Sequence, residues 1–377
     1  MSEVRSTVGT SSPEFVRAKK YNRTKLVLGL IASVLSFVFT VAFLAFGFSH
    51  TLRDAAYSFS PNDYIALVVF LFALGTMESV ISLPFGFYSG YILEHRYNLS
   101  NQTLARWAWE RTKGLLVGAP FMLLVVFVLF YCVRMYGDWW WLPVSCALTF
   151  FSIVLARIVP TFIMPLFYKF TPIDNGSLRD RITKLCTNAG VRIEGIFSFN
   201  MSKNTKKANA GFTGIGKAKR IILGDTLVKE FSEEEIETVF AHELGHYKHK
   251  HIIIGIVVGI LSTFIGLFVT SRLYALSLGW FGFSSIADIA ALPLLGLWLS
   301  VFGFVTAPLG NILSRKHERE ADTYAVHTTH NKSAFVSALQ KLSTTNLADP
   351  APHPLVEFLF YSHPSIARRI ALVESLE

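Results

Sequence analysis

Five consecutive residues, His242-Glu243-Leu244-Gly245-His246, have the types and spacing of a zinc-binding helix. Residues four apart on a helix share one face, so the imidazoles of His242 and His246 can bind one Zn²⁺ ion. Glu243 lies about 100° around the helix from His242, where its carboxylate can activate a metal-bound water and pass the proton to a leaving amine. HExxH also arises by chance, and a solvated helix with two histidines is the alternative.

A catalytic zinc site needs a third protein ligand, and a downstream segment offers one. Asn311, Arg315, Glu318 and Asp322 are spaced by four, three and four residues, which predicts that they share one helical face. Glu318 would complete a His₂Glu site with one position open for water. Asp322, one turn further, would accept the N–H of a ligand imidazole and fix its orientation. The alternative is an amphipathic helix at the membrane surface whose charges face water.

Two more histidines follow the HExxH motif but do not fit the same ion. On a continuous helix His249 faces the right way, yet it lies about 10 Å further along the axis than His242. His251 would point to the opposite face, and Glu320 would face away from Glu318. We expect supporting, interfacial or surface roles for both histidines.

The composition places these motifs in a membrane protein. The chain has 377 residues, of which 52% are apolar and 16% charged, against about 25% charged in soluble domains, and its mean hydropathy is +0.43. Disorder, a small disulfide scaffold and a single soluble globule are excluded. Six apolar stretches can each cross a bilayer, and they cover approximately residues 26–49, 62–92, 115–133, 141–169, 252–276 and 286–310.

The distribution of basic residues predicts the topology. The net charge is +9, and Lys and Arg concentrate in the segments that lie inside if both termini are cytoplasmic. Nucleic-acid binding is not predicted, because the chain has neither a basic patch with interleaved aromatics nor a recognition motif. Cys132, Cys146 and Cys186 form no metal or redox pair.

These patterns predict an all-α polytopic membrane protein, with about six transmembrane helices, that carries a small cytosolic α+β zincin-like domain. In that domain we expect a helix over 176–189, β-prone runs at 191–199 and 218–223, and a capping box, Ser232 to Glu235, that opens the HExxH helix. The predicted organisation is a flexible polar and basic tail (1–24), four spans (25–169), the zincin-like subdomain (170–251), two further spans (252–310), and a C-terminal helical segment with the third ligand (311–377).

The paired zinc motifs resemble those of the integral-membrane gluzincin peptidases that include the type I CAAX prenyl endopeptidase. The resemblance covers approximately residues 65–375 and extends to the segments 81–88, 165–172, Asn209-Ala210, 217–227 and His363-Pro364 with Arg369. It implies that the spans enclose a large chamber with the zinc site at its cytosolic side. The chain departs from the family in lacking an additional N-terminal span and in having Tyr247 where many relatives have Trp.

The resemblance also implies roles for individual residues. Glu318 would be the third zinc ligand, Glu243 the general base and acid, and Asp322 the partner of a ligand histidine. Asn209 and Ala210 would bind the substrate backbone by β-addition. The remaining expectations are that His363 and Arg369 hold the substrate carbonyl or the oxyanion, that Asn311 and Arg315 support the ligands, and that Glu78 lines the chamber. Ordinary docking of a C-terminal helix is the alternative for His363 and Arg369.

The resulting hypothesis is a zinc endopeptidase with one Zn²⁺ per chain that removes the C-terminal tripeptide from prenylated CAAX proteins. A general quality-control metalloprotease of the bacterial heat-shock type is the first alternative. A non-catalytic scaffold or translocation-clearing factor with structural zinc is the second, and the intact Glu243 argues against it. The expected partners are a peptide or protein substrate and the lipid of an endoplasmic reticulum or bacterial plasma membrane; the sequence makes no prediction about oligomeric state.

Overall fold

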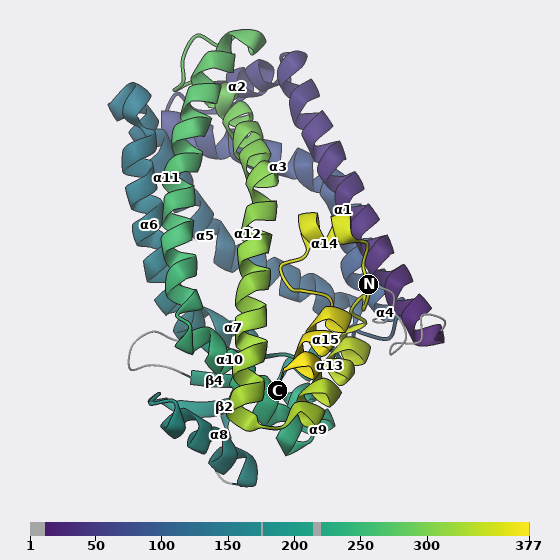
Figure 1. Cartoon of the computed structure of the whole chain (residues 1–377). Coiled ribbons are helices and arrows are strands. Elements are labelled where there is room, and N and C mark those ends of the chain that lie inside the picture. Colours follow the sequence, from purple (N-terminus) through teal and green to yellow (C-terminus); the bar gives the residue numbers. More distant parts are fainter. Residues whose placement is uncertain (1–11, 175, 214–219, 377) are drawn as a thin grey trace.

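Six long apolar helices form the larger part of the molecule (Figure 1). The computed structural model describes residues 12–174, 176–213 and 220–376. Within these residues, the helices long and apolar enough to cross a membrane are Pro13–Ala45, Asp63–Arg96, Leu104–Trp139, Trp141–Phe167, His251–Phe281 and Ile289–Thr329. This agrees with the six predicted spans and with the predicted fold class.

Most of these spans are built from one principal helix. The principal helices are α1 (Pro13–Ala45), α3 (Asp63–Phe87), α5 (Leu104–Tyr136), α6 (Trp141–Ile158), α11 (His251–Ser277) and α12 (Leu292–Thr329). A π-helical turn, Tyr88–Ile92, follows Pro84 before α4 (Leu93–Arg96), and a second one, Val159–Ile163, contains Pro160 before α7 (Met164–Phe167). Prolines in a helix free backbone groups and bend the axis, so these are the expected interruptions.

The spans have buried residues near their two ends and none along their middle stretches. No residue is buried in the stretches 22–42, 71–92, 104–129, 146–163, 252–265 and 296–314. Helices packed in a solid bundle would each show a buried stripe through these turns. The distant ends pack through two apolar clusters, one of which includes Phe43 and Phe70 and the other Trp140 and Tyr274. This arrangement is the one expected of helices around a chamber.

The predicted polar tail, residues 1–24, is wrong from Pro13 onward. Residues 1–11 lie outside the described part of the chain. Ser12 accepts a hydrogen bond from the N–H of Phe15, and Pro13 stands at the first helical position, so α1 begins there. Ala18 and Tyr21 are buried against other elements. The many basic residues of this segment led to the prediction of a tail. The segment is helical, and of its described residues up to 24 only Ala18 and Tyr21 are buried.

A small mixed sheet stands below the spans (Figure 1). Its order is β1 (Phe170–Pro172), β2 (Gly195–Phe199), β4 (Arg220–Gly224) and β3 (Ala210–Thr213), with β2 and β4 parallel and the other pairs antiparallel. β2 falls within the first β-prone run and β4 overlaps the second, whereas β1 was not predicted and β3 lies in the Gly-rich segment between the runs. Residues 214–219, where the second run begins, are outside the described residues.

Helices pack around the sheet to form one core. They are α8 (Ser177–Asn188), α9 (Asp225–Glu230), α10 (Glu233–Lys248), α13 (Lys332–Asn346) and α15 (Ile366–Ser375). Two further helices lie elsewhere: α14 (Pro354–Phe360) packs on α12, and α2 (Phe48–Phe59) lies at the distant end of the spans (Figure 1). The main cluster joins residues of 178–244 to residues of 325–373. The segments predicted as separate domains, 170–251 and 311–377, therefore share one hydrophobic core, and α12 runs unbroken through the predicted boundary at 310/311.

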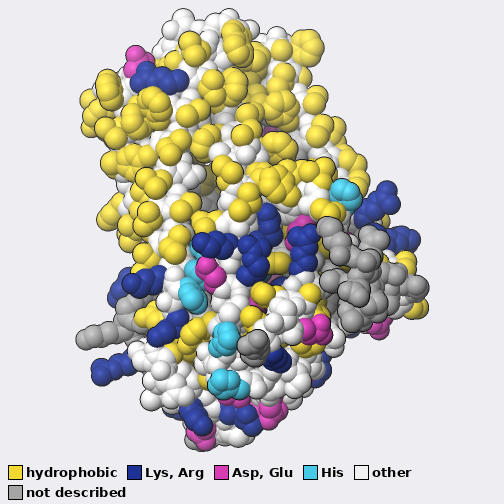
Figure 2. Space-filling model, viewed as in Figure 1, with side chains coloured by type: hydrophobic (Ala, Val, Ile, Leu, Met, Phe, Trp, Pro, Cys, Tyr) yellow, Lys and Arg dark blue, Asp and Glu magenta, His cyan; other side chains and the backbone are white. Residues whose placement is uncertain are grey.

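Charge separates the two halves of the molecule. Figure 2 shows hydrophobic side chains covering the half that holds the spans, while Lys, Arg, Asp, Glu and His gather mainly on the half that holds the sheet. Apolar surface of this extent is stable only against lipid. The polar half is therefore the part of the protein outside the bilayer.

Candidate metal centre and peptide cleft

Two helices cross at the HExxH motif. The Ser232 hydroxyl accepts from the Glu235 N–H and the Glu235 carboxylate from the Ser232 N–H, so α10 begins with the predicted capping box. A Cβ on Gly245 would lie 3.0 Å from the Cα of Ala321. Glycine at this position therefore lets α12 approach α10 closely enough for their side chains to meet.

The three predicted ligands lie together at this crossing. His242 Nε2 is 3.2 Å from His246 Nε2 and 3.4 Å from Glu318 Oε2, and His246 Nε2 is 3.3 Å from Glu318 Oε1. Zinc–ligand distances of about 2.0 to 2.1 Å in a tetrahedron require ligand atoms about 3.3 Å apart. Glu318 Oε2 is buried and has no hydrogen-bond partner among the described residues. The donor types, their spacing and a buried carboxylate oxygen that accepts no hydrogen bond from the described residues all fit a metal ion.

His242 is held by a buried ion pair. Its Nδ1 lies 2.8 Å from Asp322 Oδ1, and the Arg369 guanidinium donates to both oxygens of Asp322, at 2.6 and 2.9 Å. Asp322 is inaccessible to solvent and Arg369 is largely buried. The expected partnership of Asp322 with a ligand imidazole is present in this geometry. Arg369, expected to hold the substrate carbonyl or the oxyanion, donates two hydrogen bonds to Asp322 and also lines the cleft.

His246 is held by a different chain of contacts. Its Nδ1 lies 3.0 Å from His251 Nδ1, and His251 Nε2 lies 2.8 Å from Glu320 Oε2. If His246 binds metal through Nε2, its Nδ1–H donates to His251, and the Nε2–H of His251 donates to the carboxylate. The prediction from a continuous helix, that His251 points to the opposite face, is therefore wrong.

The reason is a break in the chain between α10 and α11. Lys250 has a left-handed backbone, with φ of 58°, so α10 ends at Lys248 and a new helix begins at His251. This turn brings the His251 ring back beside His246 and stacks it on His317 at a centroid distance of 3.9 Å. His249 remains exposed at the end of α10.

Glu243 lies beside the ligands, as the helical wheel predicts. It lines a cleft of about 570 Å³ together with His242, His246 and Glu318. Burial raises the pKa of Glu243 above its ordinary value, while the two neighbouring histidines oppose that shift. A carboxylate in this position can hold a water against the metal site and exchange a proton with it.

The same cleft is bordered by the edge strand β3. Gly224 N–H donates to Asn209 O at 2.8 Å, and Ala210 pairs with Leu223 across the antiparallel ladder. In this alternation the N–H and C=O of Ala210 point away from β4, and both Asn209 and Ala210 line the cleft. The backbone of Ala208 is already used by the Asn346 side chain, at 2.9 and 3.1 Å.

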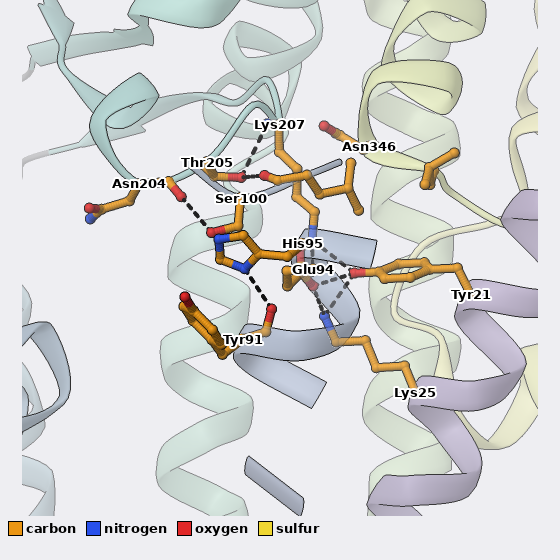
Figure 3. A network of polar contacts seen from close by, with 12 residues as sticks. Tyr21, Lys25, Tyr91, Glu94, His95, Ser100, Asn204, Thr205, Lys207 and Asn346 are labelled. Atoms are coloured by element: carbon orange, nitrogen blue, oxygen red, sulfur yellow. Dashed lines mark hydrogen bonds and ion pairs between the residues drawn. The ribbon is translucent and has the colours of Figure 1, made fainter. Parts of the chain in front are cut away.

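A cluster of charged residues ties α1 and α4 to the segment that leads into β3 (Figure 3). Glu94 is buried and bonds Tyr21, Lys25 and Lys207. Burial lowers the pKa of Lys207, and the nearby Lys25 acts in the same direction. The cluster holds the first span against the strand that borders the cleft.

His363 reaches the site from the C-terminal segment. Its Nε2 lies 3.3 Å from Glu318 Oε1, its side chain is 61% exposed, and it lines the cleft. A donor that faces the cleft next to a ligand is suitably placed to meet an oxyanion.

Asn311 and Arg315 have a role that differs from the one expected. Asn311 donates to the carbonyl of Leu359, and Arg315 donates to the carbonyls of Glu357 and Tyr361. Both therefore hold α14 and the turn before His363, not the metal ligands. Glu78, also expected to face the chamber, accepts from Ser36 and Thr40 of α1.

Comparisons with known proteins agree with this geometry. Residues 7–169 match the model of the CAAX prenyl protease N-terminal region with five membrane helices, and residues 172–377 match peptidase family M48. The chain is 33% identical to YhfN of Bacillus subtilis, named as an uncharacterized metalloprotease, over 97% of this chain and 86% of that protein. It is 28% identical to CAAX prenyl protease 1 of Saccharomyces cerevisiae, over 96% of this chain and 85% of that protein.

A solved structure shows the same architecture. The crystal structure of S. mikatae Ste24p superposes with a TM-score of 0.86 at 26% identity, covering 96% of this chain and 89% of that one. The structural match spans both the apolar helices and the half that carries the cleft. The chain therefore belongs to peptidase family M48, and it is an integral-membrane metalloendopeptidase.

Proposed function

We propose that this peptidase uses one zinc ion to remove the C-terminal tripeptide from prenylated CAAX proteins, with the lipid lodged between the spans. The observation that carries the proposal is one cleft that contains His242, His246, Glu318 and Glu243 and also the outward-facing backbone of Ala210. This combination suits hydrolysis of a peptide bond held in an extended conformation.

Zinc bound by His242, His246 and Glu318 would supply a Lewis acid and a water of lowered pKa. Glu243 would accept a proton from the attacking water and deliver it to the amine of the departing peptide. Ala210 pairs with the backbone of the substrate, and the Asn209 side chain fixes its position beside the edge strand. His363 donates to the oxygen on which negative charge develops at the scissile carbonyl.

The CAAX substrate is supported by the relatives and by the membrane part of the fold. Several relatives are named CAAX prenyl proteases, including those of Saccharomyces cerevisiae and Arabidopsis thaliana. The six spans show no buried residue through their middle stretches, so an apolar chain attached to the substrate can lie between them. A lipid-bearing C-terminus would then place its peptide at the polar end of the spans, where the cleft lies.

We further propose that the site and both termini face the cytoplasm, in an endoplasmic reticulum or bacterial plasma membrane. Lys and Arg are abundant in the polar half of the chain. The loops expected on the other side of the membrane, near 50–61, 134–140 and 272–285, hold one Arg each, which is the bias that marks the basic segments as cytoplasmic. The first turns of α1 also contact the polar half, where Asn22 donates to the carbonyl of Leu347. The site and the start of the first span thus share one side.

The test uses purified, zinc-loaded protein and two peptides that differ only in a farnesyl group on the CAAX cysteine. We expect release of the last three residues from the lipidated peptide alone, identified by mass. Glu243→Gln should abolish this release while retaining zinc, whereas Glu234→Gln, a surface carboxylate on the same helix, should not change it.

Other products would change the proposal. Equal cleavage of both peptides, or cleavage of misfolded membrane proteins at scattered bonds, would favour the general quality-control protease. Turnover by pure Glu243→Gln protein at the original rate would contradict the assigned role of this carboxylate.

A further inference from the structure

A second cleft, separate from the metal centre, lies where the sheet meets the ends of the spans. Its volume is about 590 Å³. Phe197 and Ile222 of the sheet pack with Met164 and Tyr168 at the end of the α6–α7 span, and all four line the cleft. The cleft therefore opens at the boundary between the apolar and polar halves.

Four basic side chains line this cleft, and they are incompletely paired. They are Arg106, Lys169, Lys203 and Arg220. Arg220 forms a two-bonded ion pair with Glu194, at 2.6 and 3.0 Å. Lys203 lies 3.7 Å from Glu110, which also pairs with Lys113 at 3.0 Å.

Arg106 and Lys169 take part in no ion pair among the described residues, and both are exposed. Among the described residues, two carboxylates thus face five cations in and around this cleft. Burial lowers the pKa of Lys203; Glu110 opposes that shift, and the nearby Lys113 and Arg106 add to it. A bound anion would relieve this repulsion.

The rest of the lining is apolar and continuous with the membrane surface. Pro160, Pro165, Leu166 and Phe167 come from the end of the span, and Leu166 is 56% exposed. On α5, one turn beyond Arg106, Trp109 is 58% exposed. Tryptophans favour the level of lipid headgroups, so Trp109 places the basic side chains at that level.

We propose that this cleft binds one anionic phospholipid, with its phosphate between Arg106, Lys169 and Lys203 and its acyl chains along the exposed surface of α6–α7. Basic pockets at the ends of membrane helices are suited to such headgroups. The apolar walls favour a lipid over a free phosphate ion, because a free ion would leave them in contact with water. The proposal does not depend on which peptide the enzyme cleaves.

The experiment measures lipid binding to the purified full chain in neutral detergent. Fluorescently labelled phosphatidylglycerol and phosphatidylcholine are titrated separately, and inorganic phosphate is then added as a competitor. The test variant is Arg106→Gln with Lys169→Gln, which breaks no described ion pair. The control is Arg23→Gln with Arg96→Gln, which removes the same charge from two other exposed arginines without a described ion pair.

We expect phosphatidylglycerol to bind more tightly than phosphatidylcholine. Each basic residue near an anionic headgroup accounts for roughly a fivefold change in affinity, so the test variant should bind about 25-fold more weakly. The control variant should bind as the native protein does. Lys203→Gln, tested alone, should also weaken binding.

Three results would overturn the proposal. Equal affinity for the two lipids would show that the cleft does not select an anionic headgroup. Equal weakening by the test and control pairs would show a general charge effect. Displacement of the lipid by millimolar inorganic phosphate would show a site for the free ion.

Discussion

The two histidine ligands of the metal centre are supported in contrasting ways. His242 meets the carboxylate of Asp322 directly, and Arg369 holds that carboxylate in a buried pair. His246 meets a second histidine, His251, which meets Glu320 at a position 36% exposed to solvent. The support of His242, made of Asp322 and Arg369, is short and buried; we call it the dry support. The support of His246, made of His251 and Glu320, is longer and ends at a carboxylate that is partly exposed to solvent.

The difference shows two physical ways to fix an imidazole. In the dry support, Asp322 and Arg369 must balance one another, because an unpaired buried charge is strongly unfavourable. In the other support, the left-handed turn at Lys250 positions His251, and solvent screens Glu320. The first support should therefore govern stability as well as metal binding, and the second mainly metal binding.

Asp322→Asn tests the dry support and should have the largest effect. The variant leaves the Arg369 charge buried without its carboxylate, so the free energy of unfolding should fall by about 3 to 5 kcal/mol. Zinc affinity should fall by roughly 10- to 100-fold, because His242 loses its charged acceptor. Thermal unfolding and chelator competition measure the two quantities, with Asp180→Asn, an exposed acid on α8, as control. Unchanged affinity would refute the role of Asp322.

His251→Ala tests the second support and should have an intermediate effect. Zinc affinity should fall about 10-fold, with a smaller loss of stability than in Asp322→Asn. His251→Asn should restore part of the affinity, since an amide can accept from His246 and donate to Glu320. His327→Ala is the matched control, because His327 is an exposed histidine on α12 with no hydrogen bond or ion pair among the described residues. Equal losses in the two alanine variants would contradict a specific role for His251.

The ligands could be predicted from sequence because each lies on a regular helix. The spacing of His242 and His246, and of Glu318 and Asp322, converts directly into shared faces. The spans were predictable for a similar reason, since a bilayer requires long apolar helices whatever their neighbours are. These features depend on local geometry alone.

The support of His246 was not predictable in the same way. The run Lys248-His249-Lys250-His251 contains neither glycine nor asparagine, the usual residues of a left-handed turn. A prediction from helical periodicity therefore continued the helix through Lys250, and it placed His251 on the wrong face of that helix. The only available signal was the change from a polar helix to an apolar span at this point.

The contacts of Asn311 and Arg315 were missed for another reason. Their helical face was predicted correctly, but α14 and the turn to His363 occupy it at this level of α12. Spacing on one helix does not reveal which element packs against it. The same limit applies to Arg369, whose partner lies 47 residues away in the sequence.

Glu235 is a third supporting carboxylate, after Asp322 and Glu320. It lies at the start of α10, the helix of His242 and His246, and remote from the metal site. Its variant should therefore have the smallest effect of the three variants. Burial alone would raise its pKa, but hydrogen bonds from Lys341, Ser337 and the Ser232 backbone lower it below the ordinary value. The folded state therefore favours the ionised form, and the resulting stability is present above the unfolded pKa of about 4.3. It is lost as the pH falls through the lower folded value.

Glu235→Gln should reduce the free energy of unfolding at pH 7 by about 1 to 3 kcal/mol, because charge-assisted hydrogen bonds become neutral ones. Zinc affinity should not change. The difference in unfolding temperature between native protein and variant should stay nearly constant from pH 7 to about 5 and shrink as the pH is lowered further toward about 3, and loss of zinc at acid pH affects both proteins alike. A difference that stays constant with pH would show that the charge of Glu235 is not what stabilises α10. A fall in zinc affinity in Glu235→Gln would show that the start of α10 also positions the ligand histidines. The contacts of Asp322 and His251 would then not be sufficient to hold them.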